Sequence, residues 1–137
     1  MAPIIAAFVL GIAAGSRTFT APAVLWLVRH RGPWAYVLGV LALLEYAGDL
    51  YPRTPSRTVP AGLMARLVSG AFCGWAVTTA AGESVVSGVL LGICGALIGA
   101  YGGLAARRRG IALIGAVPAA LLEDVIAIVV ALAAVAF

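Results

Sequence analysis

Long apolar runs alternate with short polar connections along the whole chain. The apolar runs cover residues 3–28, 34–51, 61–81, 84–106 and 111–136. A helix needs about 20 apolar residues to cross the hydrocarbon core of a bilayer. The pattern therefore predicts an all-α, polytopic transmembrane bundle of about five segments, which occupies residues 1–137 as a single integral membrane domain.

The first and last runs contain helix-breaking residues near their middle. Gly15 and Pro22 interrupt the first run, and Gly115 and Pro118 interrupt the last. Proline removes a backbone hydrogen bond and clashes with the preceding turn, and glycine lowers helix propensity, so both helices are predicted to be broken. Irregular backbone at membrane depth persists only where protein buries it or where it lines a cavity, and such segments mark the binding sites of many transporters.

Glycines recur every three or four residues along the fourth run. They are Gly88, Gly92, Gly95, Gly99 and Gly103. Small residues at this spacing lie on one helical face and let two helix backbones approach closely in a membrane. The stripe predicts a packing face whose partner is either another helix of this chain or a second copy. Because so small a chain has few helices with which to enclose a site, we expect a homo-oligomer.

Composition and charge exclude an ordinary soluble domain. Hydrophobic residues make up 64% of the chain and charged residues only 10%, which is far from the usual soluble composition. The net charge of +4 is carried by arginines in short loops and apolar runs, which points to lipid headgroups and membrane topology and not to nucleic acid. With five spans, Arg53, Arg57 and residues 107–109 share one face opposite Arg29 and Arg31. The positive-inside rule then places the first group and the N-terminus in the cytoplasm. An inverted or mixed topology stays open, and so does a first segment that turns back at Gly15, which would move the N-terminus to the other face.

Three charged residues lie deep inside the first and last runs: Arg17, Glu123 and Asp124. A charge at bilayer depth costs about 2.5–3.5 kcal/mol on insertion scales, so it is usually paired and often functional. Adjacent acids on a helix point about 100° apart, so one arginine is not expected to satisfy both. The second carboxylate is a candidate for binding a cation or a proton, with Ser16 and Thr18 as neutral ligands. A purely structural ion pair is the alternative.

A second charged group surrounds the end of the second run. Glu45 and Asp49 are four residues apart and share a helix face, and Arg53, Arg57 and Arg66 follow. One interpretation is an ion-pair network that holds neighbouring helices in register. The other is a site in which the acids bind a cation and the arginines bind a phosphate, as in a membrane enzyme or binder of a lipid phosphate. No Gly-rich phosphate loop or nucleotide-binding signature accompanies these residues.

Several short motifs resemble one bacterial inner-membrane family, known only as domain of unknown function four-one-two-six. They are Gly15-Ser16-Arg17, Glu45 with Asp49 and Pro52, the stretch from Gly99 to Arg107, and Gly115, Pro118, Glu123 and Asp124. The resemblance implies a small multi-pass protein of the bacterial inner membrane whose charged positions matter. It implies no substrate or reaction, and the chain is shorter after Asp49 than the pattern of that family.

The leading interpretation is a carrier or channel-like transporter of a small ion or polar solute that uses the buried arginine and acids. The alternatives are a membrane-embedded enzyme or binder of a lipid phosphate, and a structural or scaffold membrane protein. We expect no cofactor and favour a protein without enzyme activity. The sequence leaves open whether a metal binds.

Overall fold

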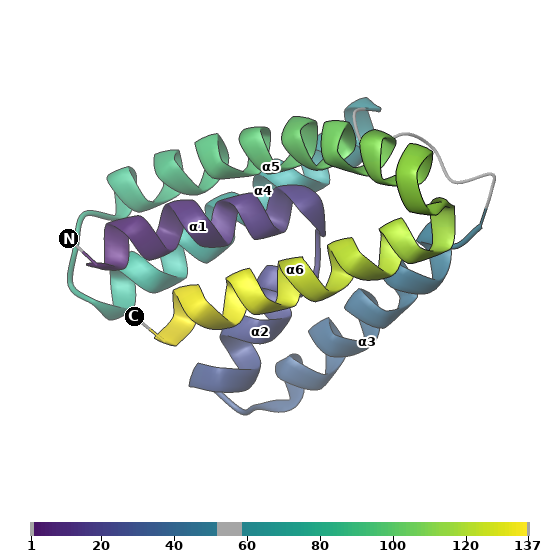
Figure 1. The fold of residues 1–137 in the computed structure, drawn as a ribbon. Helices are drawn as coiled ribbons and strands as arrows, with labels where there is room; N and C mark the ends of the chain where they lie inside the picture. The colour runs from purple at the N-terminus through teal and green to yellow at the C-terminus, as the bar shows by residue number, and fades with distance from the viewer. Residues whose placement is uncertain (1, 52–58, 137) are drawn as a thin grey trace.

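The chain folds into helices joined by short turns (Figure 1). The computed structural model describes residues 2–51 and 59–136. The helices are α1 (Ala2–Ser16), α2 (Thr20–Arg29), α3 (Pro33–Asp49), α4 (Pro60–Ala80), α5 (Val85–Ile114) and α6 (Ala116–Ala136). The all-α prediction is confirmed for the described residues, and α4, α5 and α6 are long and apolar enough to cross a membrane.

The first predicted segment consists of two short helices, so the described part of the chain forms six helices where five segments were predicted. The helical hydrogen bonding lapses between Ser16 and Thr20, where the sequence predicts a break. At 1.5 Å per residue, α1 is about 22 Å long and α2 about 15 Å, and each is shorter than a hydrocarbon core of about 30 Å. Pro22 lies in the first turn of α2, where a missing N–H breaks no helical bond.

The chain reverses direction between α1 and α2. Near the start of α1, Ile5 shares a groove with Ala133 of α6. At the end of α2, Arg29 Nη2 donates to the carbonyl oxygen of Val135 at 3.5 Å. Both ends of the pair therefore lie beside the last turns of α6, near the two termini (Figure 1). A first segment that turns back, which is the alternative that the sequence leaves open, puts the N-terminus at the end of the bundle opposite the turn between α5 and α6 (Figure 1).

Residues 107–110, predicted to form a loop, are helical. Arginine is a good helix former and Gly110 alone does not end the helix, so α5 continues to Ile114. It ends at Gly115, whose φ of 91° is a left-handed conformation that favours glycine. Pro118 lies in the first turn of α6. The last predicted segment is thus broken at Gly115, and Glu123 and Asp124 lie in regular helix.

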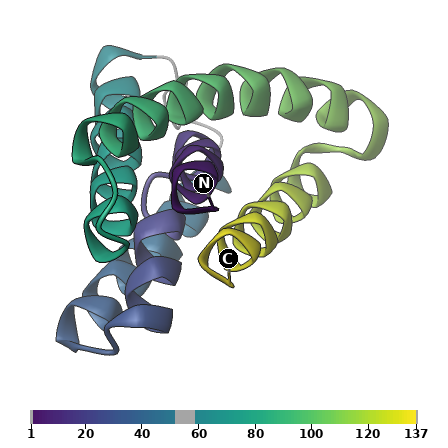
Figure 2. The same ribbon diagram turned by 90° about the vertical axis from the view of Figure 1, so that its left-hand side faces the viewer.

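Glycines bring α5 against α1 and α4 of the same chain. A Cβ added at Gly92 would overlap the carbonyl oxygen of Gly70 in α4. A Cβ at Gly99 would overlap the carbonyl oxygen of Ile12 in α1. Gly103, the last glycine of the stripe, is half-buried. As a result α1 lies at the centre of the bundle, with α4, α5 and α6 around it (Figure 2).

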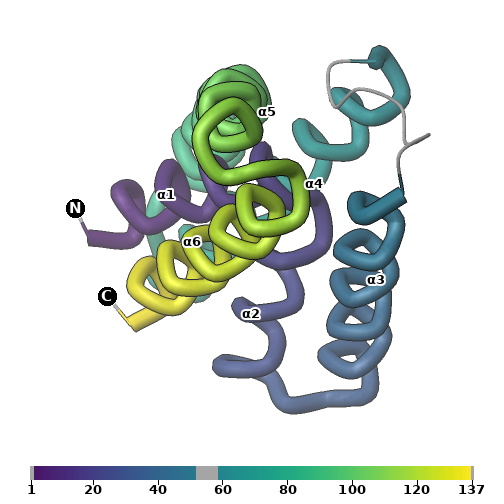
Figure 3. Tube along the Cα trace, turned by 45° about the vertical axis from the view of Figure 1, so that its right-hand side comes forward, coloured from purple at the N-terminus to yellow at the C-terminus, as the bar shows by residue number. Residues whose placement is uncertain are grey.

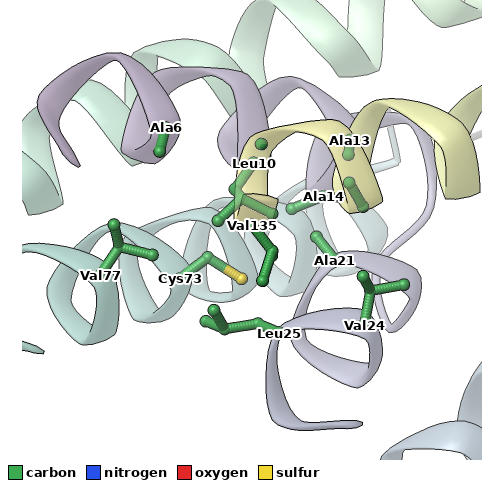
Figure 4. Close-up of a cluster of buried hydrophobic side chains, with 12 residues drawn as sticks. Ala6, Leu10, Ala13, Ala14, Ala21, Val24, Leu25, Cys73, Val77 and Val135 are labelled. Atoms are coloured by element: carbon green, nitrogen blue, oxygen red, sulfur yellow. The ribbon is translucent and has the colours of Figure 1, made fainter. Parts of the chain in front are cut away.

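The apolar core lies where α1, α2, α4 and α6 meet. Leu10, Leu25, Cys73, Val77 and Val135 come from these four helices and pack together with several alanines (Figure 4). Cys73 is a buried free thiol and packs there as a small apolar residue.

Helix α3 lies at the side of the bundle, next to α2 (Figure 3). Only Ala35 and Ala42 of α3 are buried, so this helix contributes little to the apolar core. Its attachment to the rest of the molecule depends on the polar side chains of its last two turns.

Candidate functional site

The site is centred on Arg17, in the break between α1 and α2. This side chain is completely buried and forms ion pairs with Asp49 of α3 and Asp124 of α6. Its Nη2 lies 4.0 Å from Glu123 Oε2, and its guanidinium lies 5.3 Å from the centre of the Tyr46 ring. A buried cation needs such partners to offset its lost hydration. The predicted meeting of Arg17 with the acids of the last segment is present.

The break also provides backbone N–H groups that bind the Glu45 carboxylate. Helix breaks leave backbone N–H groups without helical partners, and here Thr18 and Phe19 donate theirs to the Glu45 carboxylate at 2.8 Å and 3.0 Å. The carbonyl oxygen of Thr18 accepts from Ser69 Oγ of α4 at 2.5 Å. Side chains of neighbouring helices thus satisfy the irregular backbone, as its survival inside a membrane requires.

Arg66 of α4 extends the same network. Its Nη2 lies 3.6 Å from Glu45 Oε1, and its Nη1 donates to the Thr18 hydroxyl at 3.4 Å. The sequence predicts that Arg66 reaches the acids of the preceding segment, and this contact is present. Arg53 and Arg57, the other predicted arginines of this group, lie outside the described residues.

A third arginine, Arg107 of α5, completes the network. Its Nη1 lies 2.7 Å from Asp49 Oδ2 and its Nη2 donates to the Asp49 carbonyl oxygen at 3.2 Å. The same Nη1 lies 3.9 Å from Glu123 Oε2, whereas Arg108 and Arg109 are exposed. The expectation of two acids facing a single arginine is therefore wrong, because α5 stays helical and turns Arg107 inward.

The spacing of glycines in the sequence indicates that Arg107 faces the inside of the bundle. The prediction of a loop at residues 107–110 left this pattern unused. Gly95, Gly99 and Gly103 are spaced by four residues, and one further step of four reaches 107. If the helix continues, Arg107 shares the inward-facing stripe of these glycines.

The two predicted charged groups form one cluster. Within the described parts of the chain it contains four carboxylates and three guanidinium groups: Glu45, Asp49, Glu123, Asp124, Arg17, Arg66 and Arg107. The sequence presents these residues as two separate groups, whereas the structure joins the groups through the ion pair between Arg17 and Asp49. Because α1 and α2 turn back at Arg17, this side chain lies within reach of the end of α3 as well as the middle of α6.

Two further polar residues of the cluster escaped the sequence analysis. The Tyr46 hydroxyl lies 2.6 Å from Thr20 Oγ1 of α2, and Ser69 supports Thr18 as described. Tyr46 follows Glu45 directly, and Ser69 lies one helical turn after Arg66, so each neighbours a predicted residue. Glu45, Tyr46 and Asp49 together attach α3 to the bundle.

A cavity of about 260 Å³ lies between α1, α5 and α6 and reaches the cluster. Its polar lining comes from Ser16, Arg107 and Glu123, and its other walls are apolar or formed by glycine. Ser16 also donates to the carbonyl oxygen of Gly99 at 3.5 Å. The cavity therefore combines one charged region with long hydrophobic walls.

No known protein family, curated protein or solved structure matches this chain. Within residues 2–51 and 59–136, no group of three or more His, Cys, Asp or Glu side chains could hold a metal ion. The four acids instead surround arginines. The arrangement places paired charges inside an apolar bundle.

Proposed function

We propose that this protein is a small multi-pass carrier of cations in a bacterial inner membrane, with Glu123 at its binding position. The observation that carries this proposal is the 260 Å³ cavity that reaches Glu123. A scaffold whose charges only fix helix register needs no such cavity. An ion carrier needs one, because its solute must reach the buried charge.

The broken pair of helices supports the same function. Helices α1 and α2 meet at Arg17, level with Asp124 near the middle of α6. Many transporters bind their solute where discontinuous helices end near the bilayer midplane. Because the helix is interrupted at Arg17, this side chain can change its ion-pair partners without the unfolding of a complete transmembrane helix.

The sign of the solute follows from the charges that meet in the cluster. The Glu123 carboxylate lines the cavity, and Arg107, the cation beside it, donates to the Asp49 carboxylate at 2.7 Å. A cation or a proton at Glu123 is therefore the solute that we propose.

The lipid-phosphate alternative lacks a comparable observation. Glu45 and Arg66 contact each other, Glu45 accepts from the Thr18 N–H and Arg66 donates to the Thr18 hydroxyl. The loop of Arg53 and Arg57 is outside the described residues. Membership of the family of domain of unknown function four-one-two-six and assembly as a homo-oligomer stay predictions.

Cation uptake into liposomes tests the proposal. The purified protein is reconstituted, and the entry of protons, rubidium and tetramethylammonium is followed. We expect uptake of at least one of them, reduced at least about tenfold by Glu123→Gln and retained by Glu83→Gln, which changes an exposed acid in the turn between α4 and α5. Uptake no greater than that of empty liposomes for all three cations, or uptake that Glu123→Gln leaves unchanged, contradicts the proposal.

A further inference from the structure

A second groove lies between the start of α1 and the last turns of α6, near the two chain termini (Figure 1). Its volume is about 260 Å³, and its lining is entirely apolar: Ala2, Ile5, Ala6, Val9, Ala133 and Ala134. At about 30 Å³ for a group the size of a water molecule, it has room for eight or nine methylenes. It is too small for a helix, which is about 10 Å across.

The end of α2 adjoins this groove. Arg29 Nη2 donates to the carbonyl oxygen of Val135 at 3.5 Å, and Val135 directly follows the groove residue Ala134. Leu25, one helical turn before Arg29 on the same face of α2, packs in the buried cluster that contains Ala6 and Ala134. The buried floor of the groove therefore contacts the face of α2 that carries Arg29.

The length of α6 places Arg29 at the surface of the membrane. At 1.5 Å per residue, the 21 residues of α6 extend about 31 Å, which matches a hydrocarbon core of about 30 Å. The last turn of α6, and Arg29 with it, therefore lies at the level of the lipid headgroups. Trp34 and Tyr36, at the start of α3, are exposed, as is typical of the aromatic belt at this level.

The turn after α2 is positively charged. Arg29 and Arg31 are both exposed, and within the described residues one of the five N–H donors of Arg29 has an acceptor, at Val135. Guanidinium groups bind phosphate through paired hydrogen bonds. An acyl chain gains little by leaving lipid for the groove, because both surroundings are equally apolar. The headgroup must therefore determine which lipid binds.

We propose that the groove, Arg29 and Arg31 form a binding site for one anionic phospholipid, whose phosphate lies at the two guanidinium groups and whose acyl chain lies between α1 and α6. A lipid in this position contacts α1, α2 and α6, and so stabilises the reversed pair of helices. The site is independent of the proposed carrier function, because the groove and the cavity that reaches Glu123 share no lining residue.

Native mass spectrometry of the purified protein tests the inference, with phosphatidylglycerol and phosphatidylcholine of identical acyl chains as probes. We expect the first phosphatidylglycerol to bind at least about tenfold more tightly than phosphatidylcholine, the effect of one additional hydrogen bond to a charged group. Arg29→Gln combined with Arg31→Gln should remove this preference. Arg108→Gln combined with Arg109→Gln, which changes two exposed arginines of α5, should preserve it.

A second pair of variants tests the groove itself. Ala133→Leu places a larger side chain in the groove and should strongly reduce the binding of phosphatidylglycerol. Ala136→Leu changes an exposed alanine of the same helix that does not line the groove, and should leave binding unchanged.

Equal binding of the two lipids overturns the inference, and so does a preference that both pairs of arginine substitutions reduce equally. Phosphatidylglycerol binding that Ala133→Leu leaves intact also overturns it, because the chain then lies elsewhere. A dimer that Ala133→Leu dissociates, without bound lipid, would assign the groove to a second copy instead. If the double variant at Arg29 and Arg31 is unstable, Arg31→Gln alone, which keeps the bond from Arg29 to α6, must still lower the preference.

Discussion

Arg17 differs from the other arginines of residues 2–51 and 59–136 in being completely enclosed by protein. Exposed ion pairs contribute little to stability, because water and salt screen them. Breaking a buried pair leaves an uncompensated charge and costs far more. Since Arg17 contacts Asp49 and Asp124 from two different helices, its guanidinium links α3 and α6 through the centre of the molecule.

Replacing Arg17 with glutamine should therefore destabilise the protein by about 3–5 kcal/mol, measured by thermal or denaturant unfolding in detergent. Arg109→Gln, which changes an exposed arginine of α5, should have almost no effect. Adding Asp124→Asn to Arg17→Gln should restore part of the loss, because paired charges act non-additively. If Arg17→Gln is no more destabilising than Arg109→Gln, then the buried network described above is wrong.

At the scale of elements, the packing of α5 depends on the absence of side chains at its contact face. Gly92 approaches Gly70 of α4, and Gly99 approaches Ile12 of α1, so closely that a Cβ at either position would overlap a carbonyl oxygen. In lipid, where helix association depends on close van der Waals contact, this proximity fixes α1 at the centre of the bundle. The position of Arg17 at the end of α1 follows from it.

Gly92→Ala should lower the free energy of unfolding by about 1–3 kcal/mol, as overpacking typically does, since backbone atoms of two helices must separate. Gly102→Ala is the control in the same helix, because its Cβ meets nothing within 4 Å. It should keep or slightly raise stability, since alanine favours helix over glycine by up to about 1 kcal/mol. Equal effects of the two substitutions in an unfolding titration would argue against the close contact.

The helices and their breaks could be predicted where the local sequence determines them. Hydropathy predicts α4 and α6 closely, and Gly15 and Gly115 mark the two breaks. The reversal of α1 and α2 was not predictable, because a broken segment that crosses and one that turns back have the same hydropathy. Arg107 was missed because three successive arginines and a glycine resemble a loop, whereas tertiary pairing with Asp49 favours helix.

For the whole molecule, the reversal of α1 and α2 sets the topology. Ile5 and Arg29, from opposite ends of the pair, both lie beside the last turns of α6. The turn between α5 and α6, at Gly115, lies at the other end of the bundle (Figure 1). If the arginines of residues 107–109 are cytoplasmic by the positive-inside rule, both termini face the opposite side.

Cysteine labelling in intact cells checks this topology. In a background with Cys73→Ala and Cys94→Ser, Ala2→Cys and Glu83→Cys should react with a membrane-impermeant maleimide from the same side of the membrane, opposite to Arg109→Cys. Five crossing segments would instead place Ala2→Cys on the side of Arg109→Cys. Labelling of Ala2→Cys and Arg109→Cys from the same side of the membrane would therefore contradict the reversal of α1 and α2.

The central claim is that cations pass through the cavity between α1, α5 and α6, and filling that cavity without altering a charge tests it most directly. The measurement is the uptake of rubidium and tetramethylammonium into liposomes that contain wild-type protein, Gly102→Leu or Gly39→Leu, each with an unchanged unfolding temperature. We predict that Gly102→Leu loses at least about nine-tenths of the wild-type uptake and that Gly39→Leu retains it, because Gly102 lines the cavity and Gly39 does not. Full uptake by Gly102→Leu would show that cations do not use this cavity and would contradict the account.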